Sequence, residues 1–169
     1  MDLTESNKHK FEIFLEVAEN LNKSFNVVPI LFGSLGLYKL IGDSGKNAND
    51  IDFLIPKEFI NERWEEFSNF IESLKFRLEN EKEHEFSRDG HVIAFGDEMD
   101  LVDDLGLKTE ELLDSEIKGV KFKELTPEQY LLCYQLMLRD NYRQEKRGDA
   151  DKEKIKLIED YLANKKLGQ

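Results

Sequence analysis

The chain lacks the residues that would make it a cross-linked or a membrane-spanning protein. It has one cysteine, so no disulfide framework can form, and Cys133 lies in an apolar helical pattern that predicts a buried, inert thiol. No apolar run approaches the roughly 20 residues that a membrane-spanning helix needs. Residues 1–6 also lack the charged-then-apolar pattern of a signal peptide. These absences predict a soluble, cytoplasmic protein with no membrane partner.

Positive charge is also scarce. Lys and Arg number 24 against 36 Asp and Glu, which gives a formal net charge of −12. Broad, sequence-independent binding to nucleic acid needs clustered positive charge, so we expect no such surface, although a small local basic site is still allowed. What the chain does have is a 40% apolar content with twelve Phe, enough to fill the core of a folded domain.

Periodicity and turn chemistry predict an α/β (α+β) fold, a small mixed β-sheet flanked by helices with a C-terminal helical extension. The predicted strands cover residues 27–32, 50–55, 85–88, 91–95 and 99–102, with an extended piece at 119–122. The predicted helices cover residues 5–23 (capped by Ser6), about two turns after residue 34, 58–78, 108–117, 126–142 and a last one around 155–162, with a bend at 143–151. We divide the chain into an α/β domain over residues 1–123 and a helical extension packed on it over residues 124–169.

The most informative stretch is an apolar run that ends at Gly33-Ser34 and is followed by an amphipathic segment. A Gly-Ser pair between a strand and a helix offers free backbone N–H groups and room for a phosphate. On the next predicted strand, Asp50 and Asp52 project side by side, and two close carboxylates favour a cation between them. Alone, the first pair is typical of an ordinary turn and the second of a solvated strand edge. Their order in one chain favours a metal-assisted phosphate site.

A third carboxylate on a neighbouring strand would complete a two-metal site for displacement at phosphorus. Asp100 is the best candidate, because it lies between apolar residues of the strand predicted at 99–102. Asp97, Asp103 and Asp104 are close in sequence, so the identity of this carboxylate stays open. An exposed charge on an edge strand is the alternative role for Asp100.

Gly33-Ser34, then Asp50-Ile51-Asp52, then a later hydrophobic-Asp-hydrophobic segment resembles the DNA polymerase beta-type nucleotidyltransferase superfamily, over about residues 27 to 103. The likeness is to small bacterial members: minimal, antibiotic and abortive-infection (toxin–antitoxin) nucleotidyltransferases. The resemblance implies transfer of a nucleoside monophosphate from a nucleoside triphosphate (ATP or another) to an acceptor hydroxyl. It implies that Gly33 and Ser34 bind the phosphates and that Asp50, Asp52 and Asp100 ligate Mg²⁺, two ions in all.

Other functions stay open beside this one. A non-catalytic module of the same fold would keep the carboxylates and bind a protein partner, and a hydrolase or cyclising enzyme would use the same site. Tyr134 and Gln135 stand where several relatives have a lysine. Cations at 139, 143 and 146 have helical spacing and suit either a triphosphate or a solvated face. The acceptor, the base and the oligomeric state have no sequence signature.

Two further patterns are rejected on spacing. Gly45-Lys46 does not form a phosphate-binding P-loop, because Leu40 stands where that motif needs glycine and Asn47 where it needs Ser or Thr. The three histidines lack the spacing of a zinc site, and we expect them at the surface or across strands. Trp64 is predicted to be a core residue.

Overall fold

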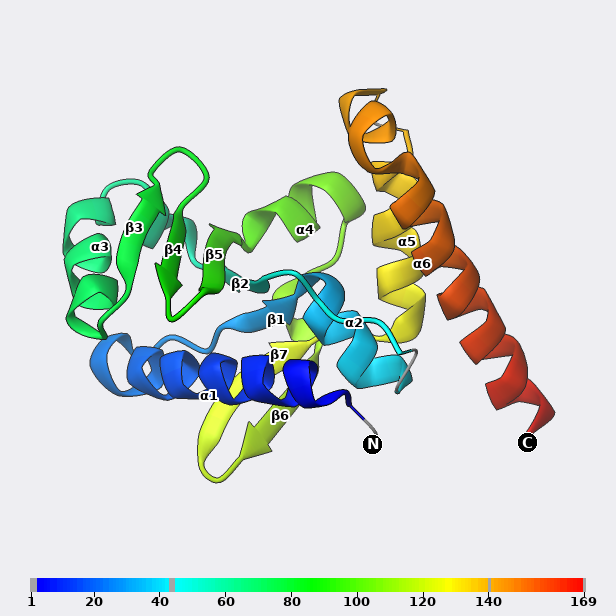
Figure 1. Ribbon diagram of the computed structural model, residues 1–169, viewed down its shortest axis with the longest axis horizontal. Helices are drawn as coiled ribbons and strands as arrows, with labels where there is room; N and C mark the ends of the chain where they lie inside the picture. The colour runs from blue at the N-terminus through cyan, green and yellow to red at the C-terminus, as the bar shows by residue number, and fades with distance from the viewer. Residues whose placement is uncertain (1–2, 43–44, 140, 169) are drawn as a thin grey trace.

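The computed structural model describes residues 3–42, 45–139 and 141–168, with residues 141–147 described by their backbone alone. Its centre is a mixed sheet with the strand order β3-β4-β5-β2-β1-β7-β6 (Figure 1). The strands are β1 (Ile30–Phe32), β2 (Ile51–Ile55), β3 (Arg77–Asn80), β4 (Glu85–Arg88), β5 (His91–Asp97), β6 (Leu113–Ile117) and β7 (Val120–Glu124). The β2–β5 and β1–β7 pairs are parallel, and the other neighbours are antiparallel. The predicted small mixed sheet is confirmed.

Helices lie on both faces of this sheet (Figure 1). They are α1 (Glu5–Phe25), α2 (Gly33–Ile41), α3 (Trp64–Ser73), α4 (Met99–Leu105), α5 (Pro127–Met137) and α6 (Asn141–Leu167), with short 3₁₀ helices η1 (Lys57–Ile60) and η2 (Thr109–Glu111). α5 and α6 form a helical pair at one side of the sheet, as the predicted extension requires. Among the described residues, no helix is both long enough and apolar enough to cross a bilayer.

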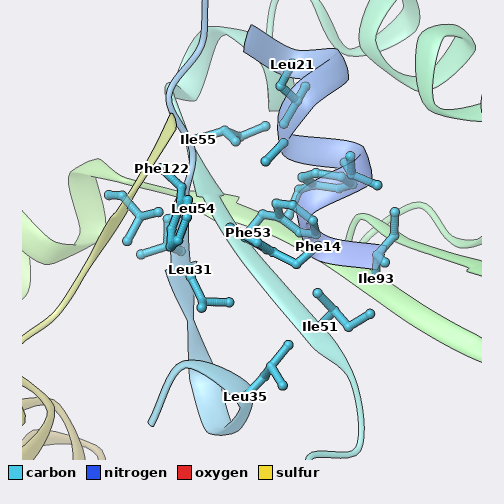
Figure 2. Packing of buried hydrophobic residues seen from close by; sticks show 14 of the residues in the cluster. Phe14, Leu21, Leu31, Leu35, Ile51, Phe53, Leu54, Ile55, Ile93 and Phe122 are labelled. Carbon is cyan, nitrogen blue, oxygen red and sulfur yellow. The ribbon is translucent and has the colours of Figure 1, made fainter. Parts of the chain in front are cut away.

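Aromatic side chains fill the layer between the sheet and the helices α1 and α3. Phe14 of α1 stacks on Phe53 of β2 with ring centroids 4.7 Å apart, and Phe53 stacks on Phe95 of β5 at 4.9 Å. Figure 2 shows Phe14 pointing from α1 onto Phe53, with Ile51 and Ile55 of the same strand nearby. Alternate residues of a strand point to opposite faces, so burial of Phe53 on this side turns Asp52 to the other side.

On the opposite face of the sheet, residues of α4 and α5 lie near Phe32 and Leu54. Phe32, the last residue of β1, packs on Tyr130 of α5 with ring centroids 6.1 Å apart. Tyr130 is fully buried, and its hydroxyl lies where a Cβ on Gly36 of α2 would be, with only 2.1 Å between them. The absence of a side chain at Gly36 therefore lets α2 and α5 pack in contact.

Several predicted elements are confirmed with adjusted ends. The Asp89-Gly90 hairpin forms, with φ of 51° and 81° at the two turn residues, as a tight two-residue turn requires. α5 begins with the expected capping box of Thr126 and Gln129 but ends before residue 142. α1 also forms, although its cap is Thr4, whose hydroxyl accepts the Asn7 N–H, and not Ser6.

Other predictions are wrong. The strand expected at 99–102 is the helix α4, because Asp97 Oδ1 accepts the Met99 N–H at its start and Gly106 ends it in the left-handed conformation. The helix expected at 108–117 is mostly the strand β6, which turns through Lys118-Gly119 into β7. The helix expected at 58–78 is shorter, since Lys75 adopts φ 75° and the chain then enters β3.

The bend expected at residues 143–151 is also wrong, because α6 runs without a break from residue 141 to 167. Its inward stripe consists of Gly148, Asp151, Lys154 and Ile158. Asp151 is 0% exposed and Lys154 is 7% exposed. Charged residues thus occupy positions that an amphipathic pattern assigns to apolar ones. Because of this, the sequence predicted a solvated bend where the helix continues.

Candidate functional site

Gly33 stands at the point where β1 meets the first turn of α2. Its φ is +70°, which favours glycine, and a Cβ at this position would lie 2.1 Å from Oδ2 of Asp52. The register explains the proximity, because Phe32 of β1 pairs with Asp52 of β2. The Asp52 carboxylate therefore lies directly over the backbone at the start of a helix, where N–H groups are free of intrahelical partners.

Asp50 immediately precedes β2, and its approach is fixed by a buried asparagine. Asn7 of α1 is 1% exposed. Its amide donates to the carbonyl of Lys46 and accepts the N–H of Ala48, each at 2.9 Å. Buried polar groups are costly unless they are hydrogen-bonded. The two hydrogen bonds of Asn7 therefore fix the position of the loop before Asp50. A loop that reads as irregular in the sequence is thereby anchored to the longest helix of the α/β part.

The predicted site residues line one cavity of about 490 Å³ on the face of the sheet opposite α1: Gly33, Ser34, Asp50, Asp52 and Asp100. Asp97 lines it too, whereas Asp103 and Asp104 do not. β5 contributes the small residues Ala94 and Gly96 to this lining, in register with Asp52 and Leu54. The structure thus brings the predicted residues to one hollow.

Asp100 reaches this cavity from the first turn of α4 and not from a strand. Its side chain is exposed, and partial burial together with the negative charges of Asp97, Asp104 and Asp103 raises its pKa above the ordinary value. Asp97 has a structural role as well, since it accepts the Met99 N–H at 2.8 Å. The acidic residues that are close in the sequence are therefore also close in the structure.

A second acidic group lies in the row of Asp52. Glu85 of β4 pairs with Ala94 of β5, which pairs with Asp52 of β2, so the three side chains share a face. Burial and then the charge of Asp50 raise the pKa of Glu85. Glu85 was not a sequence candidate, because only the strand register brings it toward Asp50.

Within the described residues, no group of three or more His, Cys, Asp or Glu side chains is placed to hold a metal ion. The oxygen donors that line the cavity are the carboxylates of Asp50 and Asp52, with Asp100 at the cavity wall. Mg²⁺ is bound in proteins by one or two carboxylates completed by water and substrate phosphate. The donor set fits such an ion, with substrate oxygens supplying the rest.

Positive charge enters the cavity from two lysines that the sequence did not single out. Lys154 of α6 is part of the same lining as Asp52 and Gly33, and its Nζ lies 5.3 Å from the centre of the Tyr134 ring. Lys82, before β4, lines the far end next to His84. Lys154 was missed because a lysine in a charged helical stretch has no pattern that separates a buried position from a solvated one.

Most of the remaining candidates lie outside the cavity. Lys46 pairs with Glu153 at 2.8 Å and does not line it, in agreement with the rejection of a P-loop. Arg139 is exposed and absent from the lining, while the side chains at 143 and 146 fall outside the described residues. Of the three histidines, His9 of α1 and His91 of β5 touch edge to face with 4.8 Å between ring centroids, whereas His84 lines the cavity. Trp64 is only partly buried but packs on the core.

Comparison with known proteins places the fold. No family model matches the sequence. An antigenic nucleotidyltransferase-like protein from Paracoccidioides brasiliensis superposes with a TM-score of 0.58 at 16% identity, over 93% of this chain and 77% of that one. ANT(2")-Ia, solved in complex with adenylyl-2"-tobramycin, gives 0.53 at 16% identity over 95% and 93% of the two chains. The lincosamide antibiotic adenylyltransferase LnuA, lincomycin-bound, gives 0.53 at 16% identity over 94% and 98%.

These superpositions show that the fold is that of small nucleotidyltransferase-like proteins, as the resemblance in the sequence implied. A relative is also found at the level of sequence. Over 151 residues, 89% of this chain and 96% of the other, the identity to the uncharacterized protein YnaI of Bacillus subtilis (strain 168) is 32%. The chain therefore belongs to the same protein family as YnaI, a family with a nucleotidyltransferase-like fold.

Proposed function

We propose that the protein is a nucleotidyltransferase that moves a nucleoside monophosphate from a nucleoside triphosphate to an acceptor hydroxyl. The observation that carries this proposal is the junction of β1 and α2, where Asp52 lies over Gly33 and both share a cavity with Ser34, Asp50 and Lys154. Free N–H groups and a lysine bind phosphate, and carboxylates beside them need a cation. Few other activities require both in one hollow.

Each of these residues has a role in the proposal. The backbone at Gly33 and Ser34 binds the terminal phosphates, and Lys154 adds positive charge from the side of α6. Asp50 and Asp52 would hold Mg²⁺, which would neutralise the phosphate charge when bound. The exposed Asp100, with its raised pKa, is the candidate to take the acceptor proton and, as predicted, to contact a second ion.

The reaction is an in-line displacement. The acceptor oxygen forms a bond to the α-phosphorus, and the bond from that phosphorus to the oxygen bridging to the β-phosphate breaks. Pyrophosphate leaves with that oxygen, and the hydroxyl proton passes to a carboxylate or to water. Complexes of ANT(2")-Ia with adenylyl-2"-tobramycin and of LnuA with lincomycin support ATP as donor and a small molecule as acceptor.

A calorimetric titration with each of the four nucleoside triphosphates, with and without Mg²⁺, tests the proposal. We expect Mg²⁺-dependent binding that falls at least tenfold in the Asp50→Asn, Asp52→Asn double variant. The Asp89→Asn, Asp103→Asn double variant is the matched control, because it removes the same two charges from exposed positions that do not line the cavity. Equal losses in both variants, or binding that ignores Mg²⁺, would contradict the assigned site.

Pyrophosphate release then separates an enzyme from a binding module. With acceptor hydroxyls supplied as a panel of small molecules, we expect product that carries the nucleoside monophosphate. Nucleotide binding without turnover on any acceptor would favour the non-catalytic alternative, in which the chain binds a protein partner as a toxin–antitoxin component does. A cytoplasmic location remains part of the proposal.

A further inference from the structure

A second, smaller cavity of about 200 Å³ lies beside the larger one, between α4 and α5. The two cavities share Phe32, Leu54, Asp100 and Met137 in their walls. A molecule in the small cavity therefore lies next to the proposed phosphate site, on the side away from Lys82 and His84. None of the residues that bind phosphate in the proposal, Gly33, Ser34 and Lys154, lines it.

Most of the small cavity is apolar. Leu101, Leu105, Cys133 and Leu136 line it, and Leu101 and Cys133 are each 3% exposed. A dry protein cavity of roughly 150 Å³ takes up benzene. The space here is suited to a group slightly larger than one six-membered ring. It is too small for a nucleotide.

The mouth of this cavity is acidic. Asp100 and Asp104 stand four residues apart on α4 and so share a helix face, and both line the cavity. Among the residues whose side chains the structure describes, its lining contains neither lysine nor arginine. Two carboxylates beside an apolar hollow complement a ligand that joins a cation to an apolar group, because each part of the ligand finds its opposite partner.

We propose that this cavity is the acceptor subsite and that the acceptor is a hydroxyl-bearing amine with an alkyl or aryl substituent. The substituent enters the hollow between α4 and α5, and the ammonium group pairs with Asp104. The acceptor hydroxyl then faces the larger cavity across the shared wall. The role of the amine as acceptor rests on the proposed function, but the binding of the amine is testable without nucleotide.

Methyl NMR of protein with ¹³C-labelled methionine tests it directly. Met137 lines both cavities, whereas Met99 is exposed and lines neither, so the Met99 methyl signal is an internal reference. The probes are 2-phenylethylamine and its neutral counterpart 2-phenylethanol. We expect the amine to shift the Met137 methyl signal in a saturable way and the alcohol to bind at least tenfold more weakly.

Two variants of α4 provide the matched comparison. Asp104→Asn removes the carboxylate at the cavity mouth, and we expect at least a tenfold loss of amine affinity. Asp103→Asn removes the same charge from the adjacent position, which is exposed and lines neither cavity, and we expect less than a twofold change. Equal losses in both variants would show attraction to the net charge alone and would overturn the proposal, as would equal binding of amine and alcohol.

The nucleotide titration distinguishes the two proposals. Amine binding lost in Asp104→Asn while nucleotide binding is retained supports the subsite. Nucleotide binding without any effect of the amine on Met137 overturns the subsite and leaves the proposed function intact. Amine binding in a protein that binds no nucleotide supports a cationic ligand in this cavity, contradicts its role as acceptor and overturns the proposed function.

Discussion

At the scale of single residues, the site depends on one missing side chain. Gly33 has both a left-handed backbone and the Asp52 carboxylate within 2.1 Å of the position that a Cβ would occupy. Sequence analysis found this glycine through its place after an apolar run, and the five predicted residues do line one cavity. It did not find Lys154 or Glu85, because their approach depends on how α6 packs and on the register of three strands.

Gly33→Ala is expected to reduce Mg²⁺-dependent nucleotide binding at least tenfold. The methyl group displaces the Asp52 carboxylate, and the left-handed backbone adds about 1–2 kcal/mol of strain. Gly119→Ala is the matched control, because Gly119 has φ +82° and open space around it. Calorimetry and chemical denaturation should show a similar backbone cost in both variants and a binding defect in the first. Full nucleotide binding by Gly33→Ala would contradict the assigned position of the phosphate.

At the scale of elements, prediction succeeded where local chemistry fixes the structure. Turn residues defined the β4–β5 hairpin, and the capping box defined the start of α5. It failed where tertiary context decides between helix and strand. Residues 99–105 mix apolar and acidic side chains in an order that suits either, and the Met99 N–H that donates to Asp97 Oδ1 marks the start of the helix. Asp100 was thus placed on the wrong element, although it lines the same cavity as the other predicted residues.

The packing of α2 on α5 gives a prediction about stability. In Gly36→Ala the new methyl group meets the Tyr130 hydroxyl, which is fully buried, so we expect a loss of about 1–3 kcal/mol in the free energy of unfolding. Adding Tyr130→Phe removes the hydroxyl and should restore part of that loss. Urea denaturation of the two single variants and the double variant measures the coupling. Additive effects of the two substitutions would show that the helices do not meet at this contact.

At the scale of the whole molecule, part of the net negative charge lies around Asp100. The net charge of −12 is distributed so that Asp97, Asp103 and Asp104 raise the pKa of Asp100, after the effect of burial. A carboxyl group whose pKa is higher in the folded state stabilises that state when protonated. This contribution is present below the ordinary pKa and is lost as the pH rises through the raised value.

Asp100→Asn should therefore stabilise the protein at pH 7 and lose that advantage as the pH falls toward 4. The effect is only about a few tenths of a kcal/mol, because water screens an exposed carboxylate. Burial and the nearby His9 lower the pKa of His91, so His91 destabilises the folded state as the pH falls below 6.5. Both proteins contain His91, so its effect cancels when their stabilities are compared. Thermal unfolding of the two proteins across this range, repeated in high salt, measures the effect. A difference that is constant with pH would contradict it.

The cavity walls come from segments that are far apart in the chain, from Gly33 at the end of β1 to Lys154 in α6. A folding intermediate that has formed the central strands but has not docked α6 onto α5 lacks the lysine of the site. Nucleotide affinity should then appear later during refolding than the fluorescence signal of Trp64, which reports the packing of α3. The appearance of nucleotide binding would then report when α6 docks onto α5.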